Sequence, residues 1–274
     1  MTAELLIQAT FRNGKTILKN SFHSPPFKLA DITEDKNDSS LRLMMMTSSP
    51  GILDNDDHRI TIELEEGCSA ELQTQSYQRL FQMKKGASQQ IEVKMAKGSS
   101  LVFLPHPCVP HKSSVFFSSN KIYLSEGCFL AWGELITCGR KMNGEVFRFS
   151  KYHSLTEIYL DGKLIMKENL QIVPGVVDVH AMGQLEGYTH QASLTCISSK
   201  SSQEVAVEKI NDQLLKENDI CFGVSAFSPV GLIVRILGYK AEHLYNILRK
   251  VTDEIYRMQE TGKNSSICKM SYKY

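Results

Sequence analysis

The short segment from residue 106 to residue 111 carries the side chains best suited to binding a transition metal. It holds two imidazoles and a thiol, from His106, Cys108 and His111, and these groups suit nickel or zinc. The prolines between them fix φ but do not decide whether the side chains converge. A proline-rich crossover between two strands explains the same residues, and we favour that interpretation over a metal site.

A second set of charged side chains lies among apolar residues and glycines farther along the chain. Glu134, Arg140 and Glu145 follow one another closely, and charges inside or beside a sheet need partners or water. Either an ion pair between Arg140 and Glu145 or the wall of a polar channel accounts for them, and the ion pair is the simpler interpretation. Glu157 follows on the next predicted hairpin, where solvation explains it equally well.

The local motifs of common enzyme classes are missing from the sequence. It contains no G-x-x-x-x-G-K-[ST], no G-x-G-x-x-G opening a helix, no G-x-S-x-G and no H-E-x-x-H. A nucleotide-binding or hydrolase site therefore has no local support. Catalytic residues can also be dispersed along a chain, so this observation concerns the common motifs alone.

Charge and composition argue against several other classes. Lys and Arg number 31 against 30 Asp and Glu, so the net charge is close to zero. The protein therefore lacks the positive charge that is typical of binding to nucleic acid or to an anionic membrane. The N-terminus lacks the pattern of a signal peptide. The apolar stretch 220–239 contains Pro229 and Arg235 and is a poor membrane span. We therefore expect a cytoplasmic protein with no membrane segment.

The cysteines do not form a recognisable framework. There are seven of them, an odd number, and no two are spaced as C-x-x-C. This pattern argues against both a disulfide scaffold and a zinc ribbon. Free, mostly buried thiols are the expected state.

An internal repeat gives the strongest prediction of the fold. Gly67, Gly98 and Gly127 are 31 and 29 residues apart, and apolar residues lie three and five positions on either side of each glycine. Period two on both sides of a glycine predicts two half-buried strands joined by a tight turn. One such unit cannot bury its apolar face alone. We therefore predict a mainly β protein in which the copies stack into a solenoid-like antiparallel β body.

The remaining pattern adds strands and then helices. Residues 146–150 alternate and predict a strand, and Asp161-Gly162 predicts a hairpin over residues 157–165. Farther on, apolar residues spaced three and four apart predict two helices. The predicted C-terminal elements are a helix capped by Ser202 and reaching residue 214, strands at 220–227 and 232–237, and a helix over 244–255.

These elements predict one domain over residues 1–274 and no separate folds. Its expected parts are a β-repeat body at about 24–175, a mixed strand and helix part at about 176–261, and a mobile tail at 262–274. No segment between them has the length of a linker between domains.

Several short motifs follow one another in a characteristic order. They are Ser24-Pro25-Pro26-Phe27-Lys28-Leu29, Ser49-Pro50-Gly51-Ile52-Leu53 with Asp56, Thr74-Gln75-Ser76, Leu104-Pro105-His106-Pro107 with Pro110, Trp132-Gly133-Glu134 leading to Gly139-Arg140 and Gly144-Glu145, and the late segment 231–238. With the glycine turns, this ordered set resembles the UreD/UreH family of urease accessory proteins.

The resemblance implies a β-rich fold with a few helices and a non-enzymatic role in urease maturation. It implies binding to UreF, indirect binding through UreF to the GTPase UreG, and docking on the catalytic subunit of urease. It also implies no tightly bound cofactor, with nickel at most in transit through a water-filled passage. Such a passage would explain Glu134 and Glu145 inside the β body, with Arg140 and Glu157 as further candidates for the same region.

Two alternatives of different classes remain open at this point. The first is a β-rich metalloenzyme that uses His106, Cys108 and His111, which tight stoichiometric metal binding would favour. The second is a purely structural interaction module whose exposed apolar strand faces need a partner. Transfer of nickel to urease would separate an accessory protein from such a module.

Overall fold

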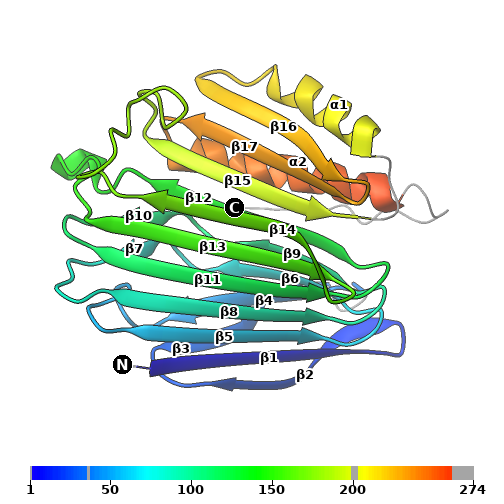
Figure 1. Ribbon diagram of the computed structural model, residues 1–274. Helices are drawn as coiled ribbons and strands as arrows, with labels where there is room; N and C mark the ends of the chain where they lie inside the picture. The colour runs from blue at the N-terminus through cyan, green and yellow to red at the C-terminus, as the bar shows by residue number, and fades with distance from the viewer. Residues whose placement is uncertain (1, 36–37, 199–202, 261–274) are drawn as a thin grey trace.

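Alternating side chains build two stacked β-sheets in the computed structural model, which describes residues 2–35, 38–198 and 203–260. In β5 (Asp57–Leu64) every second residue from His58 onward is buried, while its neighbours are partly or fully exposed. This is the period expected of a strand with one face on the core. The prediction of a mainly β protein is confirmed (Figure 1).

Sheet A forms the front layer in Figure 1 and has the strand order β14–β13–β11–β8–β5–β1–β2. The strand β1 pairs in parallel with β5, so the β body begins well before residue 24. The strands of sheet A, besides β5, are β1 (Thr2–Arg12), β2 (Lys15–His23), β8 (Ala87–Met95), β11 (Val115–Leu124), β13 (Lys151–Leu160) and β14 (Lys163–Ile172).

Sheet B packs face to face against sheet A and has the order β16–β17–β15–β12–β9–β6–β4–β3, with β10 beside β12 and β7 beside β10. Its strands are β3 (Phe27–Asp31), β4 (Leu41–Thr47), β6 (Ser69–Thr74), β7 (Gln78–Leu80), β9 (Ser100–Leu104), β10 (Cys108–Pro110), β12 (Phe129–Thr137), β15 (His190–Ile197), β16 (Ile220–Ser228) and β17 (Gly231–Gly238).

The glycine turns connect the two sheets and do not close hairpins. In each copy the strand before the glycine lies in sheet A and the strand after it lies in sheet B. Successive copies then pair in parallel, as β5 does with β8 and β6 with β9. The predicted stacking is confirmed, but the predicted antiparallel pairing within the repeats is wrong.

The reason lies in how the apolar faces are covered. A hairpin would place the apolar residues of both strands on one face of a single sheet, which would still need a cover. An arch between two sheets lets the two halves of each copy cover one another. Gly67, Gly98 and Gly127 have φ of 70°, 67° and 73° at these corners, a region that glycine enters without steric cost.

Parallel stacking places equivalent side chains in straight rows across sheet A. Ile62, Val93, Ile122 and Ile158 are in register on neighbouring strands, and each is 0% exposed. Leu72, Leu101 and Leu130 of sheet B belong to the same buried cluster. The row in sheet A and these leucines of sheet B together form the apolar centre of the repeat body.

The C-terminal part extends sheet B and covers its outer face with helices. The helix α1 (Gln203–Leu214) packs beside β16, and α2 (Ala241–Glu260) packs on β12, β15 and β17. Both predicted helices and both predicted strands of this part are confirmed, as is the hairpin at Asp161-Gly162 between β13 and β14. Among the described residues, no helix combines the length and apolarity that a membrane span requires.

One predicted strand is absent. Residues 146–150 form a loop after the 3₁₀ turn η1 (Lys141–Asn143). The alternation there reflects Phe147 and Phe149, which are buried in a separate apolar cluster, while Phe147 has a φ of 50° that breaks the extended chain. The predicted cap Ser202 and the predicted tail 262–274 lie outside the described residues.

The buried row gives a test of the packing. Replacing Ile122 with alanine should lower the free energy of unfolding by about 2–5 kcal/mol, because the lost side chain leaves a cavity between two rigid sheets. Lys121→Ala, on the exposed face of the same strand, is the matched control and should stay within about 0.5 kcal/mol of the parent. Urea denaturation measures both, and equal effects would contradict the proposed core.

Candidate functional site: a polar cavity between the sheets

A cavity of about 240 Å³ opens between the inner faces of the two sheets. Its wall in sheet A comes from the first residues of β5, β8, β11 and β13, and its wall in sheet B from the end of β6 and from β9 and β12. Its mouth is bordered by residues 47–52 and 74–79. The cavity therefore lies at the end of the sandwich where the strands of sheet A begin.

The wall in sheet A is a row of polar side chains. His58, Gln89, Ser118 and Ser154 are in register on β5, β8, β11 and β13, on the face that turns toward sheet B. The next row inward is half polar, with Ile60 and Ile91 followed by Asn120 and Thr156, and the row after that is entirely apolar. Polarity thus falls step by step from the cavity into the core.

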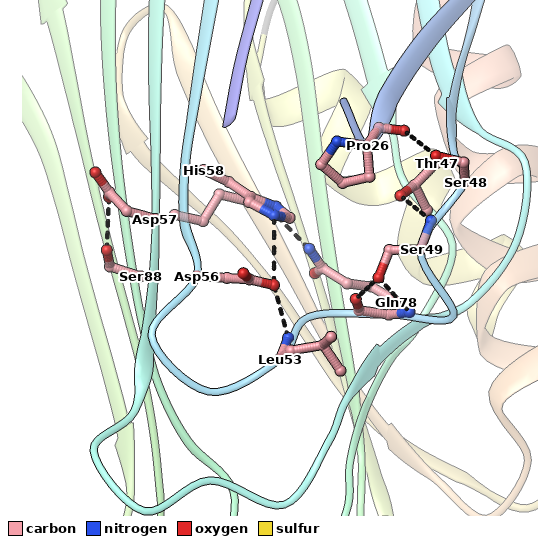
Figure 2. A network of polar contacts seen from close by, with 12 residues as sticks. Pro26, Thr47, Ser48, Ser49, Leu53, Asp56, Asp57, His58, Gln78 and Ser88 are labelled. Carbon is pink, nitrogen blue, oxygen red and sulfur yellow. Dashed lines mark hydrogen bonds and ion pairs between the residues drawn. The ribbon is translucent and has the colours of Figure 1, made fainter. Parts of the chain in front are cut away.

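The loop at the mouth is held by close backbone packing. Ile52 donates its backbone N–H to Arg79 O at 2.8 Å, and Phe81 donates to Ile52 O at 2.9 Å. A Cβ on Gly51 would lie 2.3 Å from the same Arg79 oxygen. Gly51 is therefore a steric requirement of the cavity rim, and Figure 2 shows the neighbouring Ser48 and Ser49 in the same loop.

Glu134 of β12 is the carboxylate that lines this cavity. Its Oε1 accepts hydrogen bonds from Asn120 Nδ2 at 2.8 Å, Thr156 Oγ1 at 3.0 Å and Ser154 Oγ at 3.2 Å. Trp132 Nε1 lies at 3.4 Å from the same oxygen. No Lys, Arg or His of the described residues forms an ion pair with it, so neutral donors alone hold this carboxylate.

Burial changes the pKa of Glu134. Desolvation raises the pKa of Glu134, and the nearby Glu168 carboxylate raises it further, while the donors Thr156, Trp132 and Ser154 partly offset these effects. A buried negative charge is costly unless it is paired. A cation entering the cavity would supply the missing counter-charge.

Glu168 extends the polar interior from β14 toward the far side of the sandwich. It lies in the same row of sheet A as Asn120 and Thr156 and binds Arg235 Nη2 of β17 at 3.1 Å. Both residues line a second cavity of about 500 Å³. Glu134 therefore lines the first cavity and Glu168 the second, and the two carboxyl groups are close enough for Glu168 to raise the pKa of Glu134.

The other predicted acids lie elsewhere. Glu145 accepts from Arg140 Nε at 2.8 Å on the surface, and this guanidinium lowers the pKa of Glu145 to about 2. Glu157 is on the outward face of β13 and pairs with Lys167 at 2.9 Å, which lowers its pKa. The structure thus brings only Glu134 of the predicted carboxylates to the cavity and forms the Arg140–Glu145 ion pair.

The predicted metal residues do not assemble. His106 shares a hydrogen bond with Thr74 Oγ1 at 3.2 Å and stacks on Tyr245 at 4.8 Å, whereas His111 packs on Phe81. Cys108 is buried on β10, where desolvation raises the pKa of its thiol strongly. Within the described ranges, no three His, Cys, Asp or Glu side chains come together as a metal site. The segment runs between β9 and β10, and its three candidate ligands face different neighbours.

The polar row was missed in the sequence, although a signal for it exists. His58, Gln89 and Ser118 each lie nine residues before the glycine of their repeat. Aligning the three copies on their glycines would have placed these polar residues on one face. The contributions of Ser154, Glu168 and Arg235 come from strands outside the repeat, so only the folded sheets reveal them.

The fold and the cavity define a class of protein: a two-layer β-solenoid scaffold that encloses a polar cavity and carries helices on one outer face. Comparison with known proteins gives the family. A family model described as UreD urease accessory protein matches residues 1–270, and the chain belongs to this family.

Relatives of known name agree with this assignment. Urease accessory protein UreD of Flavobacterium johnsoniae is 46% identical over 261 residues, covering 95% of this chain and 94% of its own. The protein of the same name from Acetivibrio thermocellus is 35% identical, covering 93% of this chain and 97% of its own. That of Haemophilus influenzae is 36% identical, covering 87% and 93%.

The raised pKa of Glu134 predicts a pH-dependent stability. A carboxyl whose pKa is higher in the folded than in the unfolded state contributes stability at low pH that is lost as the pH rises through the folded pKa. Glutamine carries no charge, so Glu134→Gln should become progressively more stable than the parent as the pH rises from 4.5, the ordinary pKa of a glutamate carboxyl, to neutral pH. Urea denaturation across this range measures the difference.

Glu157→Gln is the control, because the pKa of Glu157 is shifted downward whereas that of Glu134 is shifted upward. Its ion pair stabilises the folded state at neutral pH, so this variant should lose stability there and approach the parent as the pH falls. If Glu134→Gln behaved in the same way as Glu157→Gln, the Glu134 carboxylate would not be the desolvated acid described above.

Proposed function

We propose that this protein is a cytoplasmic assembly factor required for nickel insertion into apo-urease and has no catalytic reaction of its own. Its family membership supports the link to urease, and its relatives are named accessory proteins. The partners in this proposal are UreF, the GTPase UreG through UreF, and the catalytic subunit of urease. The single structural observation that carries the proposal is the polar cavity that ends at Glu134.

The cavity is suited to a divalent cation in transit. Its inner wall offers the oxygens of Glu134, Ser118 and Ser154, and one carboxylate surrounded by neutral groups attracts a hydrated ion without enclosing it. Hard oxygen ligands in small number hold nickel weakly enough for release. In this proposal nickel is the cargo of the protein, and the protein needs no tightly bound cofactor.

The alternatives fit the described residues less well. A metalloenzyme based on His106, Cys108 and His111 loses its support because these side chains face different neighbours. A purely structural interaction module would not need a desolvated carboxylate in a cavity, since leaving this charge without a cation costs stability. The accessory function accounts for both the family and the buried acid.

Deleting only this chain from a strain that otherwise expresses the whole urease gene cluster tests the function. We expect urease subunits to accumulate with little nickel and little activity, because the transfer step is missing. Metal content of purified urease and its urea hydrolysis measure the result, and reintroducing the gene should restore both. Full activity without this chain would refute the proposal.

The role of the cavity predicts a sharper difference between two single substitutions. Glu134→Gln keeps the shape and the acceptor oxygen of the side chain but removes its charge, so nickel loading should slow by about tenfold or more, while pull-down of UreF and urease is unchanged. Glu157→Gln removes a charge from the outer face and should activate urease within about twofold of the parent. Equal activation rates for the two variants would remove Glu134 from the path of the ion.

A further inference from the structure

The two sheets do not end together on the side of the sandwich that carries β14 and β16. The ion pair between Glu168 and Arg235 places β17 of sheet B opposite β14, which is the last strand of sheet A. Sheet B continues beyond β17 with one more strand, β16, at the top of Figure 1. No described strand of sheet A lies opposite β16. The sandwich therefore ends here in a step that is one strand wide.

Both strands that border the step have a free edge. Beyond their ladders with β13 and β17, neither β14 nor β16 makes a further backbone-to-backbone hydrogen bond within the described part of the chain. A long free edge is a template for another strand, and proteins usually shorten or cover such edges. β14 has ten residues and β16 has nine, so the two edges match in length.

The face of β16 that turns toward the step carries small, uncovered side chains. Cys221, Gly223 and Ser225 are exposed, and Gly223 is paired with Arg235, which points at sheet A. A Cβ on Gly223 would meet no atom within 4 Å. A second β-layer can therefore approach this face closely. Ile165 of β14 and Phe227 of β16 are only partly buried and would gain cover from the same layer.

The directions of the strands show which layer fits. β12 runs opposite to β11 and β13, because a glycine corner separates β11 from β12. Three antiparallel pairings lead from β12 to β16, so β16 runs in the direction of β13, whereas β14 runs against it. A half-turn about an axis parallel to the strands keeps every direction and exchanges the two layers. It brings β16 of a second copy beside β14 in antiparallel orientation.

We propose that the chain forms a symmetric dimer through this step, in which β14 of each copy pairs with β16 of the other. The extra strand of each sheet B fills the place that is missing in the other copy's sheet A. The interface is closed and isologous, because both copies contribute the same two strands. The inference goes beyond the role in nickel insertion and does not depend on it.

Charges beside the two edges complement each other. α1 turns Lys209 toward the groove that it forms with α2, so Glu204 and Glu208 lie on the opposite flank of α1, beside the free edge of β16. The exposed lysines of β14 are Lys163 and Lys167. α1 and β14 both run against β16 in the dimer. The order of the two lysines therefore matches the order of the two acids, which favours a second copy over an unrelated strand.

Crosslinking through one thiol near the two-fold axis tests the arrangement. Ser225→Cys is combined with Cys221→Ser and Cys268→Ser, and the other cysteines of the chain are buried. In the dimer, the two copies of residue 225 face each other across about 10 Å, the distance between packed sheets. A short bismaleimide should then give a species of twice the 30.9 kDa chain mass. Lys94→Cys, on the exposed face of β8, is the control in the same background and should not crosslink.

Analytical ultracentrifugation of the parent and of matched variants measures the dimer itself. Gly223→Trp fills the face of β16 and should raise the dimer dissociation constant at least about tenfold with an unchanged far-ultraviolet circular dichroism spectrum, whereas Gly223→Ala should remain dimeric. At low salt, Glu208→Lys should raise the constant at least about threefold, because it places a positive charge beside β14. Lys209→Glu, on the flank facing α2, should stay within about twofold of the parent.

A parent chain that sediments as a monomer and gives no crosslink through Ser225→Cys would overturn the dimer. Equal crosslinking through Lys94→Cys would overturn the pairing of β14 with β16, as would a dimer that Gly223→Trp leaves intact. A monomer that Gly223→Trp destabilises in urea would show that the chain fills its own step, and would exclude the second copy. These measurements use the purified chain, so they can fail independently of the urease deletion.

Discussion

The register between successive copies of the glycine repeat determines which side chains share a row, and every other feature of the structure depends on it. Parallel pairing with no offset in the repeat, as between β5 and β8 and between β8 and β11, places equivalent positions side by side. A slip of one residue in any strand would turn its inward side chains to solvent. The apolar row at Ile62, Val93 and Ile122 fixes this register, because these side chains would lose their burial in any other register.

The same register makes the cavity. Nine residues before each repeat glycine the side chain is polar, and the shared register sets these residues along one wall between the sheets. A single buried polar group would be a local defect, whereas a row of them encloses a volume that water or an ion can occupy. The core and the cavity are therefore two consequences of one arrangement, with the polar row and the apolar row four residues apart along each strand.

The polar interior also shows how this scaffold manages charge. Glu168 is neutralised by Arg235 across the gap between the sheets, while Glu134 is surrounded by neutral donors. The first arrangement is an ion pair between β14 and β17, and the second is a carboxyl whose charged form has no counter-charge among the described side chains. Of the two arrangements, the carboxyl without a counter-charge is the one on the proposed path of nickel.

The sequence by itself determined the mainly β fold, the stacking of glycine-punctuated copies and the two C-terminal helices, because periodicity and glycine chemistry are local properties that survive without tertiary information. It also determined the family, since the order of short motifs is a property of the chain. Only the tertiary structure decided that the glycine corners join two sheets, because a hairpin and an arch have the same local pattern and differ in what covers them. Only the packed sheets could separate Glu134 in the cavity from Glu145 and Glu157 at the surface, since this difference depends on neighbouring strands that lie far apart in sequence.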